Sequence, residues 1–144
     1  MVGLVLCGHN RFGEGLYSAL ELIAGSPNNC EVVTFLEGEG NIELNAKLKA
    51  AYDSLFKECD SVIVLADLAG GGPFKSAVEV GLAYENVYVM GGTNLPLLIE
   101  MSFARQFENN PKKLIENAIT TGQQQIVVFN KDVNRHEEEI GDGI

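Results

Sequence analysis

The sequence predicts a single α/β domain with a largely parallel sheet and helices on both faces. Short apolar runs alternate with segments whose apolar residues recur at helical spacing. Glycine-rich turns separate these segments, and the 144 residues are enough to bury one hydrophobic core. We expect the domain to span residues 1–130, followed by a polar, acidic tail over residues 131–144.

Five apolar runs are expected to form strands. The third run is the most apolar, as is typical of a strand buried on both faces. Right-handed crossovers between the early strands favour the flavodoxin-like order 2-1-3-4. The expected strands cover residues 2–6, 31–36, 62–66, 87–90 and 125–129.

Five segments between and after these runs have the periodicity of amphipathic helices. Asn41 is expected to cap the second helix and Asn94 the fourth, and Pro73 suits the first turn of the third. The expected helical segments cover residues 13–24, 41–55, 74–83, 94–104 and 112–121.

Composition narrows the class of protein. The formal net charge of −10 argues against nucleic acid as a partner. It is compatible with docking of a basic protein, although solubility alone explains it equally well. No apolar stretch reaches the roughly 20 residues that span a bilayer, and the short N-terminal run lacks the basic flank of a signal peptide. Three cysteines without paired spacing indicate a reduced, cytoplasmic protein in which thiols mainly pack.

Candidate chemistry lies at the ends of the first and third strands. His9 follows the first run, and Asp67 opens the glycine-rich loop after the third. In the order 2-1-3-4 these strands are neighbours at the point where ligands bind. A carboxylate on one ring nitrogen makes the other a better nucleophile, while Gly70, Gly71 and Gly72 turn backbone N–H groups toward an anion at a helix N-terminus. This combination describes a histidine that carries a phosphoryl group.

Other interpretations stay open from the residues alone. A strand-end histidine is often structural, and tight turns need glycine for their own sake. The loop lacks the Gly-Lys-Ser/Thr ending of a nucleotide P-loop, and no dinucleotide fingerprint or metal-ligand spacing surrounds His9. Cys7 and His9 are a conceivable nucleophilic pair, although a strand-end cysteine more often points into the core. His136, beside an acidic run, is assigned no function.

Three motifs together resemble a known family. The first consists of the histidine followed by the sequence Gly-Glu-Gly-Leu. The second is an Asp-Leu-x-Gly-Gly-x-Pro-Phe loop, and the third contains the sequence Asn-Leu-Pro. They lie at Gly8-His9 with Gly13-Glu14-Gly15-Leu16, at residues 67–74 and at residues 92–98. In this order and spacing they resemble the IIA domain of the mannose family of the bacterial phosphoenolpyruvate-dependent sugar phosphotransferase system, over about residues 2–130.

The resemblance implies a phosphoryl carrier without a cofactor or metal. His9 would take a phosphoryl group on Nε2 from phospho-HPr and pass it to a IIB subunit, with Asp67 orienting the ring. IIB would then phosphorylate a sugar that enters through membrane IIC and IID subunits. The family fold ends in an antiparallel strand, which residues 125–129 fit, and family members form homodimers that can exchange this strand.

The chain departs from the family pattern at three positions. Gly72 stands where many members have Ser, Asn10 replaces a glycine, and Gly8 replaces Thr or Ser. The third motif and the Asp-Gly-Ile ending resemble the N-acetylgalactosamine-type branch. Because no linker or second domain follows, IIB is expected to be a separate polypeptide. Two alternatives are a phosphoryl-relay domain of a dihydroxyacetone kinase and a regulatory module whose phosphorylation state another protein recognises.

Overall fold

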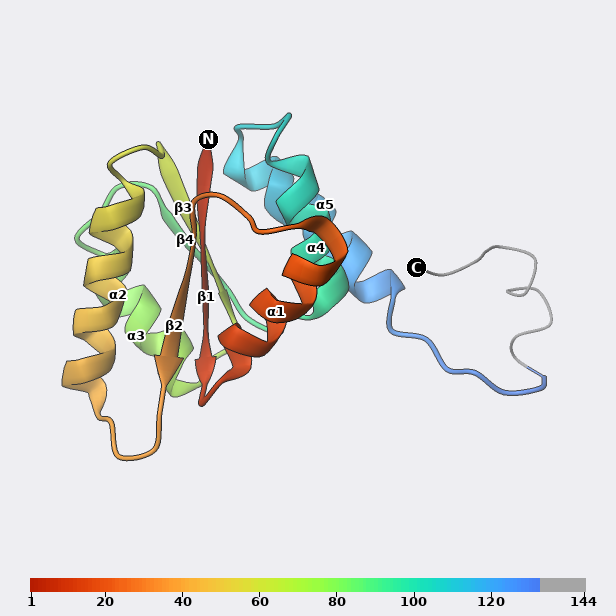
Figure 1. Cartoon of the computed structure of the whole chain (residues 1–144), viewed down its shortest axis with the longest axis horizontal. Helices are drawn as coiled ribbons and strands as arrows, with labels where there is room; N and C mark the ends of the chain where they lie inside the picture. The colour runs from red at the N-terminus through yellow and green to blue at the C-terminus, as the bar shows by residue number, and fades with distance from the viewer. Residues whose placement is uncertain (133–144) are drawn as a thin grey trace.

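Four parallel strands form one open sheet at the centre of the molecule (Figure 1). The structure, a computed structural model, describes residues 1–132, so the expectation for His136 lies outside the described residues. The predicted order is confirmed, because the strands lie in the order β2-β1-β3-β4. Their bounds are β1 (Val2–His9), β2 (Cys30–Phe35), β3 (Ser61–Ala66) and β4 (Val87–Met90).

Helices cover both faces of this sheet, which confirms the predicted three-layer α/β architecture (Figure 1). One face carries α1 (Phe12–Ala24), α4 (Leu95–Ala104) and α5 (Pro111–Gln124). The other carries α2 (Asn41–Leu55) and α3 (Gly72–Gly81). No helix within residues 1–132 has the length and apolar character needed to cross a membrane.

Side-chain alternation along β1 divides the core into two clusters. Val2, Leu4 and Leu6 pack with α1, α4 and α5, whereas Val5 and Cys7 pack with α2 and α3. Because both faces of the strand are buried, its sequence is a nearly continuous apolar run. Full burial of each such aliphatic side chain contributes roughly 1.5–3 kcal/mol.

Two elements at the carboxyl edge extend further than predicted. β1 continues through His9, because the backbone stays paired with β2 up to the His9–Phe35 position. An apolar pattern reports only on the burial of side chains. It therefore does not predict these last residues of β1, which are held by backbone pairing. Likewise α3 begins at Gly72, with Pro73 in its first turn. His9 is therefore fixed by a strand rather than carried on a loop.

Of the two predicted asparagine caps, one is confirmed and one is wrong. The Asn94 side chain accepts a hydrogen bond from the Leu97 backbone N–H at 3.0 Å, as an N-cap does. Asn41 instead is the first residue of α2, and Gly40 is the N-cap. The Glu43 carboxylate, in the first turn of α2, accepts from the Gly40 backbone N–H at 2.9 Å and so satisfies the donor of the N-cap residue.

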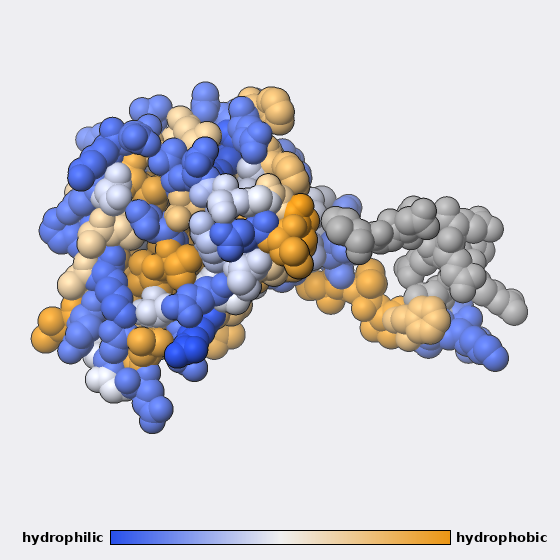
Figure 2. All heavy atoms as spheres, in the orientation of Figure 1, coloured by the Kyte–Doolittle hydropathy of each residue, from blue (hydrophilic) through white to orange (hydrophobic). Residues whose placement is uncertain are grey.

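The antiparallel strand predicted over residues 125–129 does not form in this chain. The α5 helix runs on to Gln124, and the following segment leaves the body of the molecule (Figure 1). Apolar side chains on it are exposed, with Ile126 at 76% and Phe129 at 77%. In Figure 2 the segment that leaves the domain contains a run of hydrophobic residues, coloured orange. β-Branched residues favour a strand only beside a sheet edge, and α5 directs this segment away from the sheet.

Candidate active site

His9 and Asp67 meet at the carboxyl edge of the sheet. His9 is the last residue of β1, and Asp67 directly follows β3, the neighbouring strand. Oδ2 of Asp67 lies 2.8 Å from Nδ1 of His9 and accepts a second bond from the His9 backbone N–H, also at 2.8 Å. Oδ1 accepts from the Leu68 backbone N–H at 2.7 Å. Both carboxylate oxygens are therefore engaged, and the one near His9 holds strand and ring together.

The charge state of Asp67 decides which ring nitrogen of His9 is available. Burial raises the pKa of this carboxyl, but hydrogen bonds from the backbone and ring of His9 and from Leu68 outweigh it and lower the pKa below its usual value. An ionised carboxylate only accepts hydrogen bonds, so Nδ1 of His9 carries the proton. In the neutral ring Nε2 then holds the lone pair, on a side chain that is 47% exposed.

The glycine-rich loop lies against the ring of His9. Gly70 adopts a positive φ of 79°, which favours glycine, and Gly71 is the N-cap of α3. A Cβ atom on Gly71 would lie 3.2 Å from Cε1 of His9, the atom between the two ring nitrogens. A Cβ on Gly72 would meet nothing closer than Cε2 of Phe35 at 3.8 Å, so that position has room for a side chain.

The first turn of α3 presents unused hydrogen-bond donors beside this ring. The Gly71 backbone N–H donates to the Leu68 carbonyl at 3.1 Å. Within residues 1–132, the backbone N–H groups of Gly72 and Phe74 have no hydrogen-bond partner. Free N–H groups and the helix dipole both favour negative charge at this point. An anionic group attached to Nε2 would therefore find compensating partial charge.

The loop after β4 stabilises the Asp67 loop through backbone hydrogen bonds. The Gly92 backbone N–H donates to the Asp67 carbonyl at 2.8 Å, and that of Thr93 donates to the Ala66 carbonyl at 3.1 Å. A Cβ on Gly91 would lie 2.6 Å from Cα of Ala69, so only glycine allows this approach. Sequence reasoning interpreted these glycines as a turn and missed this contact; two consecutive glycines at a strand end were the available signal.

Asn10 ends β1 directly after the candidate nucleophile. Its φ is +52°, in the left-handed region that asparagine tolerates better than most residues. The Asn10 backbone N–H donates to the Phe35 carbonyl at 2.8 Å. The ring of Phe35 lies 6.2 Å from that of His9, centroid to centroid. Asparagine thus serves where the resembling family often has glycine, and pairing of β1 with β2 places Phe35 beside the histidine.

A Cys–His nucleophile is not supported by the surroundings of Cys7. Cys7 is fully buried in the cluster under α2 and α3. Burial raises the pKa of its thiol to about 12, with a further contribution from the charge of Asp67, so the thiol stays protonated. Among residues 1–132, no three His, Cys, Asp or Glu side chains are grouped to hold a metal ion.

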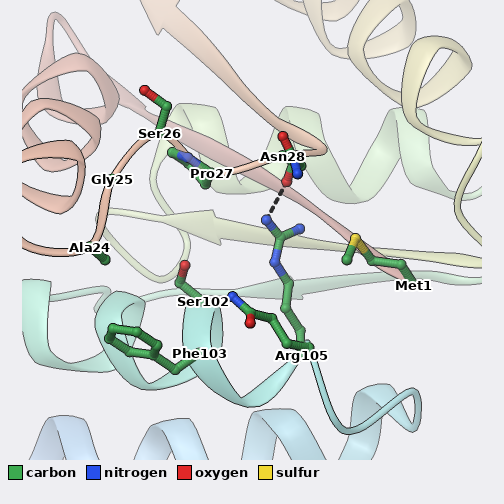
Figure 3. A pocket seen from close by; sticks show the side chains of 10 residues that line it. Met1, Ala24, Gly25, Ser26, Pro27, Asn28, Ser102, Phe103 and Arg105 are labelled. Atoms are coloured by element: carbon green, nitrogen blue, oxygen red, sulfur yellow. Dashed lines mark hydrogen bonds between the residues drawn. The ribbon is translucent and has the colours of Figure 1, made fainter.

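A cavity of about 420 Å³ lies at the opposite end of the strands from His9, near the amino ends of β1 and β2 (Figure 3). Arg105, the C-cap of α4, reaches across it and is only 4% exposed. Nη1 donates to the carbonyls of Val2 at 2.9 Å and Asn29 at 3.0 Å, and Nη2 donates to that of Asn28. Burial lowers the pKa of this guanidinium.

The position of Arg105 gives it a structural role. Its bonds join the C-terminus of α4 to the start of β1 and the loop before β2, and the partial negative charge of the helix end favours a cation there. Sequence reasoning did not select this residue. The signal was its spacing, because Arg105 follows Met101 by four residues on the inward face of α4.

The fold and site define an open α/β domain with an accessible histidine, fixed by a carboxylate, at the switch point of the sheet. Residues 3–119 match the family model described as the PTS system fructose IIA component. The chain therefore belongs to this family of phosphotransferase system IIA components, as the three motifs predicted.

Known relatives cover the same domain. The PTS system fructose-specific EIIA component of Bacillus subtilis is 28% identical over 135 residues, which is 94% of this chain and 91% of the relative. The PTS system mannose-specific EIIAB component of Escherichia coli is 28% identical over 123 residues, 85% of this chain, which spans only 38% of that longer protein. The crystal structure of a phosphotransferase system component EIIA from Streptococcus agalactiae superposes with a TM-score of 0.79 at 27% identity, covering 90% of this chain and 98% of that one.

Proposed function

We propose that this chain carries a phosphoryl group on Nε2 of His9, which it accepts from phospho-HPr and passes to a IIB domain or subunit during sugar uptake of the mannose or amino-sugar type. One observation carries the proposal. Asp67 engages Nδ1 of His9 at 2.8 Å and leaves Nε2 on an accessible side chain. Membership of the IIA component family supports the same conclusion.

The transfer step uses the lone pair of Nε2. This nitrogen attacks the phosphorus of the phosphohistidine on HPr, so a new N–P bond forms while the donor's N–P bond breaks and returns its electron pair to the donor ring. The His9 ring becomes positively charged and keeps its proton on Nδ1, where the Asp67 carboxylate stabilises it. An acceptor side chain of IIB then attacks the phosphorus in the reverse sense.

The glycine-rich loop is proposed to hold the transferred group. Phosphoryl oxygens attached to Nε2 would accept hydrogen bonds from the backbone N–H groups of Gly72 and Phe74 at the start of α3, with Gly70 and Gly71 shaping the loop. Because position 72 is glycine, backbone donors and the helix dipole supply this contact without a hydroxyl group. No metal or cofactor enters this step.

The partner proteins are proposed to dock over the carboxyl edge of the sheet. Exposed apolar side chains lie at this edge, with Leu68 at 60% and Ile42 at 84%. HPr and IIB would use the same surface in turn, because each must bring its reacting atom to Nε2. The chain would act in the cytoplasm and reach the membrane only indirectly, through IIB and the IIC and IID subunits.

A homodimer is the proposed assembly, built from the exposed C-terminal segment. Residues 126–129 are all at least 65% exposed and strongly apolar. An apolar groove of about 290 Å³ borders the outer strand β4 and includes Val78, Leu82, Val87 and Val89. Paired antiparallel to β4 of a second copy, the segment would cover this edge. Light scattering should give a dimer for the full chain and a monomer after truncation at Gln125; an unchanged dimer would refute this arrangement.

Phosphorylation by purified components tests the function. Incubation with enzyme I, HPr and phosphoenolpyruvate should place one acid-labile phosphate on the wild-type chain and on the His136→Ala control, but none on His9→Ala. Addition of a purified cognate IIB should then remove the label. A His9→Ala protein that labels normally would exclude the proposal. A labelled protein that fails to pass the phosphate to IIB would favour the kinase-relay or regulatory alternatives.

A further inference from the structure

The side chains of Phe12 and Asp67 fill the space beside Gly8. A Cβ atom on Gly8 would lie 2.6 Å from Cδ1 of Phe12 and 2.9 Å from both Cγ and Oδ2 of Asp67. Phe12 is the first residue of α1, and Asp67 follows β3. Glycine at position 8 therefore lets an aromatic ring and the carboxylate of the site converge on one small volume.

Close packing of α1 on the sheet determines where this ring lies. A Cβ on Gly13, the residue after Phe12, would lie only 2.7 Å from the carbonyl oxygen of Leu6 in β1. The first turn of the helix is regular, with the Gly15 backbone N–H donating to the Arg11 carbonyl at 3.0 Å. Phe12 is thus held by the contact of a helix with a central strand rather than by a flexible loop.

The carboxylate oxygen that borders Gly8 is the one that holds His9. Oδ2 accepts both the backbone and the Nδ1 hydrogen bonds of His9. The Asp67 side chain is 12% exposed, compared with 47% for His9, so the carboxylate is the more enclosed member of the pair. Because the ring and the carboxylate border the same small volume beside Gly8, the ring limits the space and the water available to the carboxylate, which favours its bonds to His9.

We propose that Phe12 is a positioning residue for phosphoryl transfer. Its ring confines the Asp67 carboxylate against Nδ1 of His9, and this keeps Nε2 directed toward the incoming phosphoryl group. The proposal rests on the proposed function of His9 as the phosphorylated residue. Phe12 acts through Asp67 rather than on the transferred group.

Single-turnover transfer from phospho-HPr tests this role with four variants. Phe12→Ala should lower the maximal rate about 10- to 100-fold, a larger effect than any change in the half-saturating HPr concentration, because Phe12 acts through Asp67. Phe12→Leu should restore most of that rate. Gly8→Ala should also slow transfer. In the double variant, Gly8→Ala with Phe12→Ala, the fold-loss in rate should be smaller than the product of the two single fold-losses, because both substitutions act on the same carboxylate.

Nuclear magnetic resonance of the unphosphorylated protein gives a readout that needs no transfer. The Nδ1 proton of His9, held by Asp67, should be protected from exchange in wild type and in the control Phe107→Ala, whose side chain is 92% exposed. It should exchange rapidly in Phe12→Ala. An unchanged proton signal with a wild-type rate overturns the proposal, as does a loss confined to the half-saturating concentration. If the wild-type protein accepts no phosphate from phospho-HPr, the proposed function of His9 is contradicted. The exchange of the Nδ1 proton then still tests whether Phe12 positions Asp67.

Discussion

Oδ2 of Asp67 lies 2.8 Å from the backbone nitrogen of His9 and 2.8 Å from Nδ1 of the same residue. One oxygen atom thus fixes both the end of β1 and the orientation of the imidazole. Because the backbone bond anchors the carboxylate, the ring is held in one orientation before any partner arrives. Preorganisation of this kind lowers the cost of reaching the transfer geometry.

Replacement of Asp67 by Asn should preserve the fold and slow phosphoryl transfer. The amide has the shape of the carboxylate, but it loses the charge that stabilises the imidazolium, and one oxygen becomes an N–H donor facing a donor of Leu68 or His9. We expect a rate loss of about 10²–10⁴-fold. Rapid-quench kinetics with phospho-HPr measures it, and a rate within about twofold of wild type would remove Asp67 from the mechanism.

The contribution of Asp67 to stability should depend on pH in a defined direction. Its pKa is lower in the folded state than its usual value, so the unfolded chain binds the proton more readily. The stabilisation is therefore complete above about pH 5 and is lost as pH falls through the lowered pKa of the folded state.

Urea unfolding of wild type and Asp67→Asn across pH measures this dependence. The difference between their free energies of unfolding should shrink as pH falls below about 4. Groups that do not contact Asp67 cancel in the difference. A difference that grows below about pH 4 would contradict the ionised state assigned to Asp67.

A methyl group should be harmful at Gly71 and tolerated at Gly72. At Gly71 it would lie 3.2 Å from both Cε1 of His9 and Cβ of Leu68, so these neighbours must shift, whereas at Gly72 the nearest atom is 3.8 Å away. Gly71 has a φ of −72°, so alanine fits its backbone and the effect comes from crowding against His9 and Leu68. We expect transfer by Gly71→Ala to fall about tenfold and Gly72→Ala to stay within about twofold of wild type. Equal rates for the two variants would disprove this account of the loop.

Two glycines of α1 offer a matched test of how the helix meets the sheet. A Cβ on Gly13 would lie 2.7 Å from the Leu6 carbonyl oxygen, while a Cβ on Gly15 meets nothing within 4 Å. Gly13→Ala should reduce the free energy of unfolding by about 1–3 kcal/mol, because α1 must move off β1. Gly15→Ala should raise it by about 0.5–1 kcal/mol through helix propensity. Denaturant unfolding would count against this packing if both variants changed stability in the same direction.

Topology explains why the sequence could predict the central pair. His9 and Asp67 follow apolar runs, and the order 2-1-3-4 makes those strands neighbours. The end of β1 was less predictable, because residues 7–9 are joined to β2 by backbone pairing that leaves no apolar pattern. Arg105 and Gly91 act through carbonyl groups and close backbone contacts, which a single sequence does not reveal before the elements are placed.

The C-terminal segment shows the limit of local propensity. Ile126 and Phe129 belong to an apolar run that favours a strand, yet α5 continues to Gln124 and directs the run outward. Asn94 contributes to that continuation, since its side chain donates to the Gly122 carbonyl at 3.0 Å and joins α5 to the start of α4. A strand depends on the sheet edge that receives it, and that edge is not encoded within the segment itself.

The position of the phosphate on the His9 ring tests the central claim most directly. After phosphorylation of ¹⁵N-labelled protein by phospho-HPr, phosphorus–nitrogen coupling identifies the modified atom. The geometry predicts coupling to Nε2, with Nδ1 still protonated and bonded to Asp67. Coupling to Nδ1 would contradict the account, because the carboxylate that orients the ring would then occupy the site of transfer.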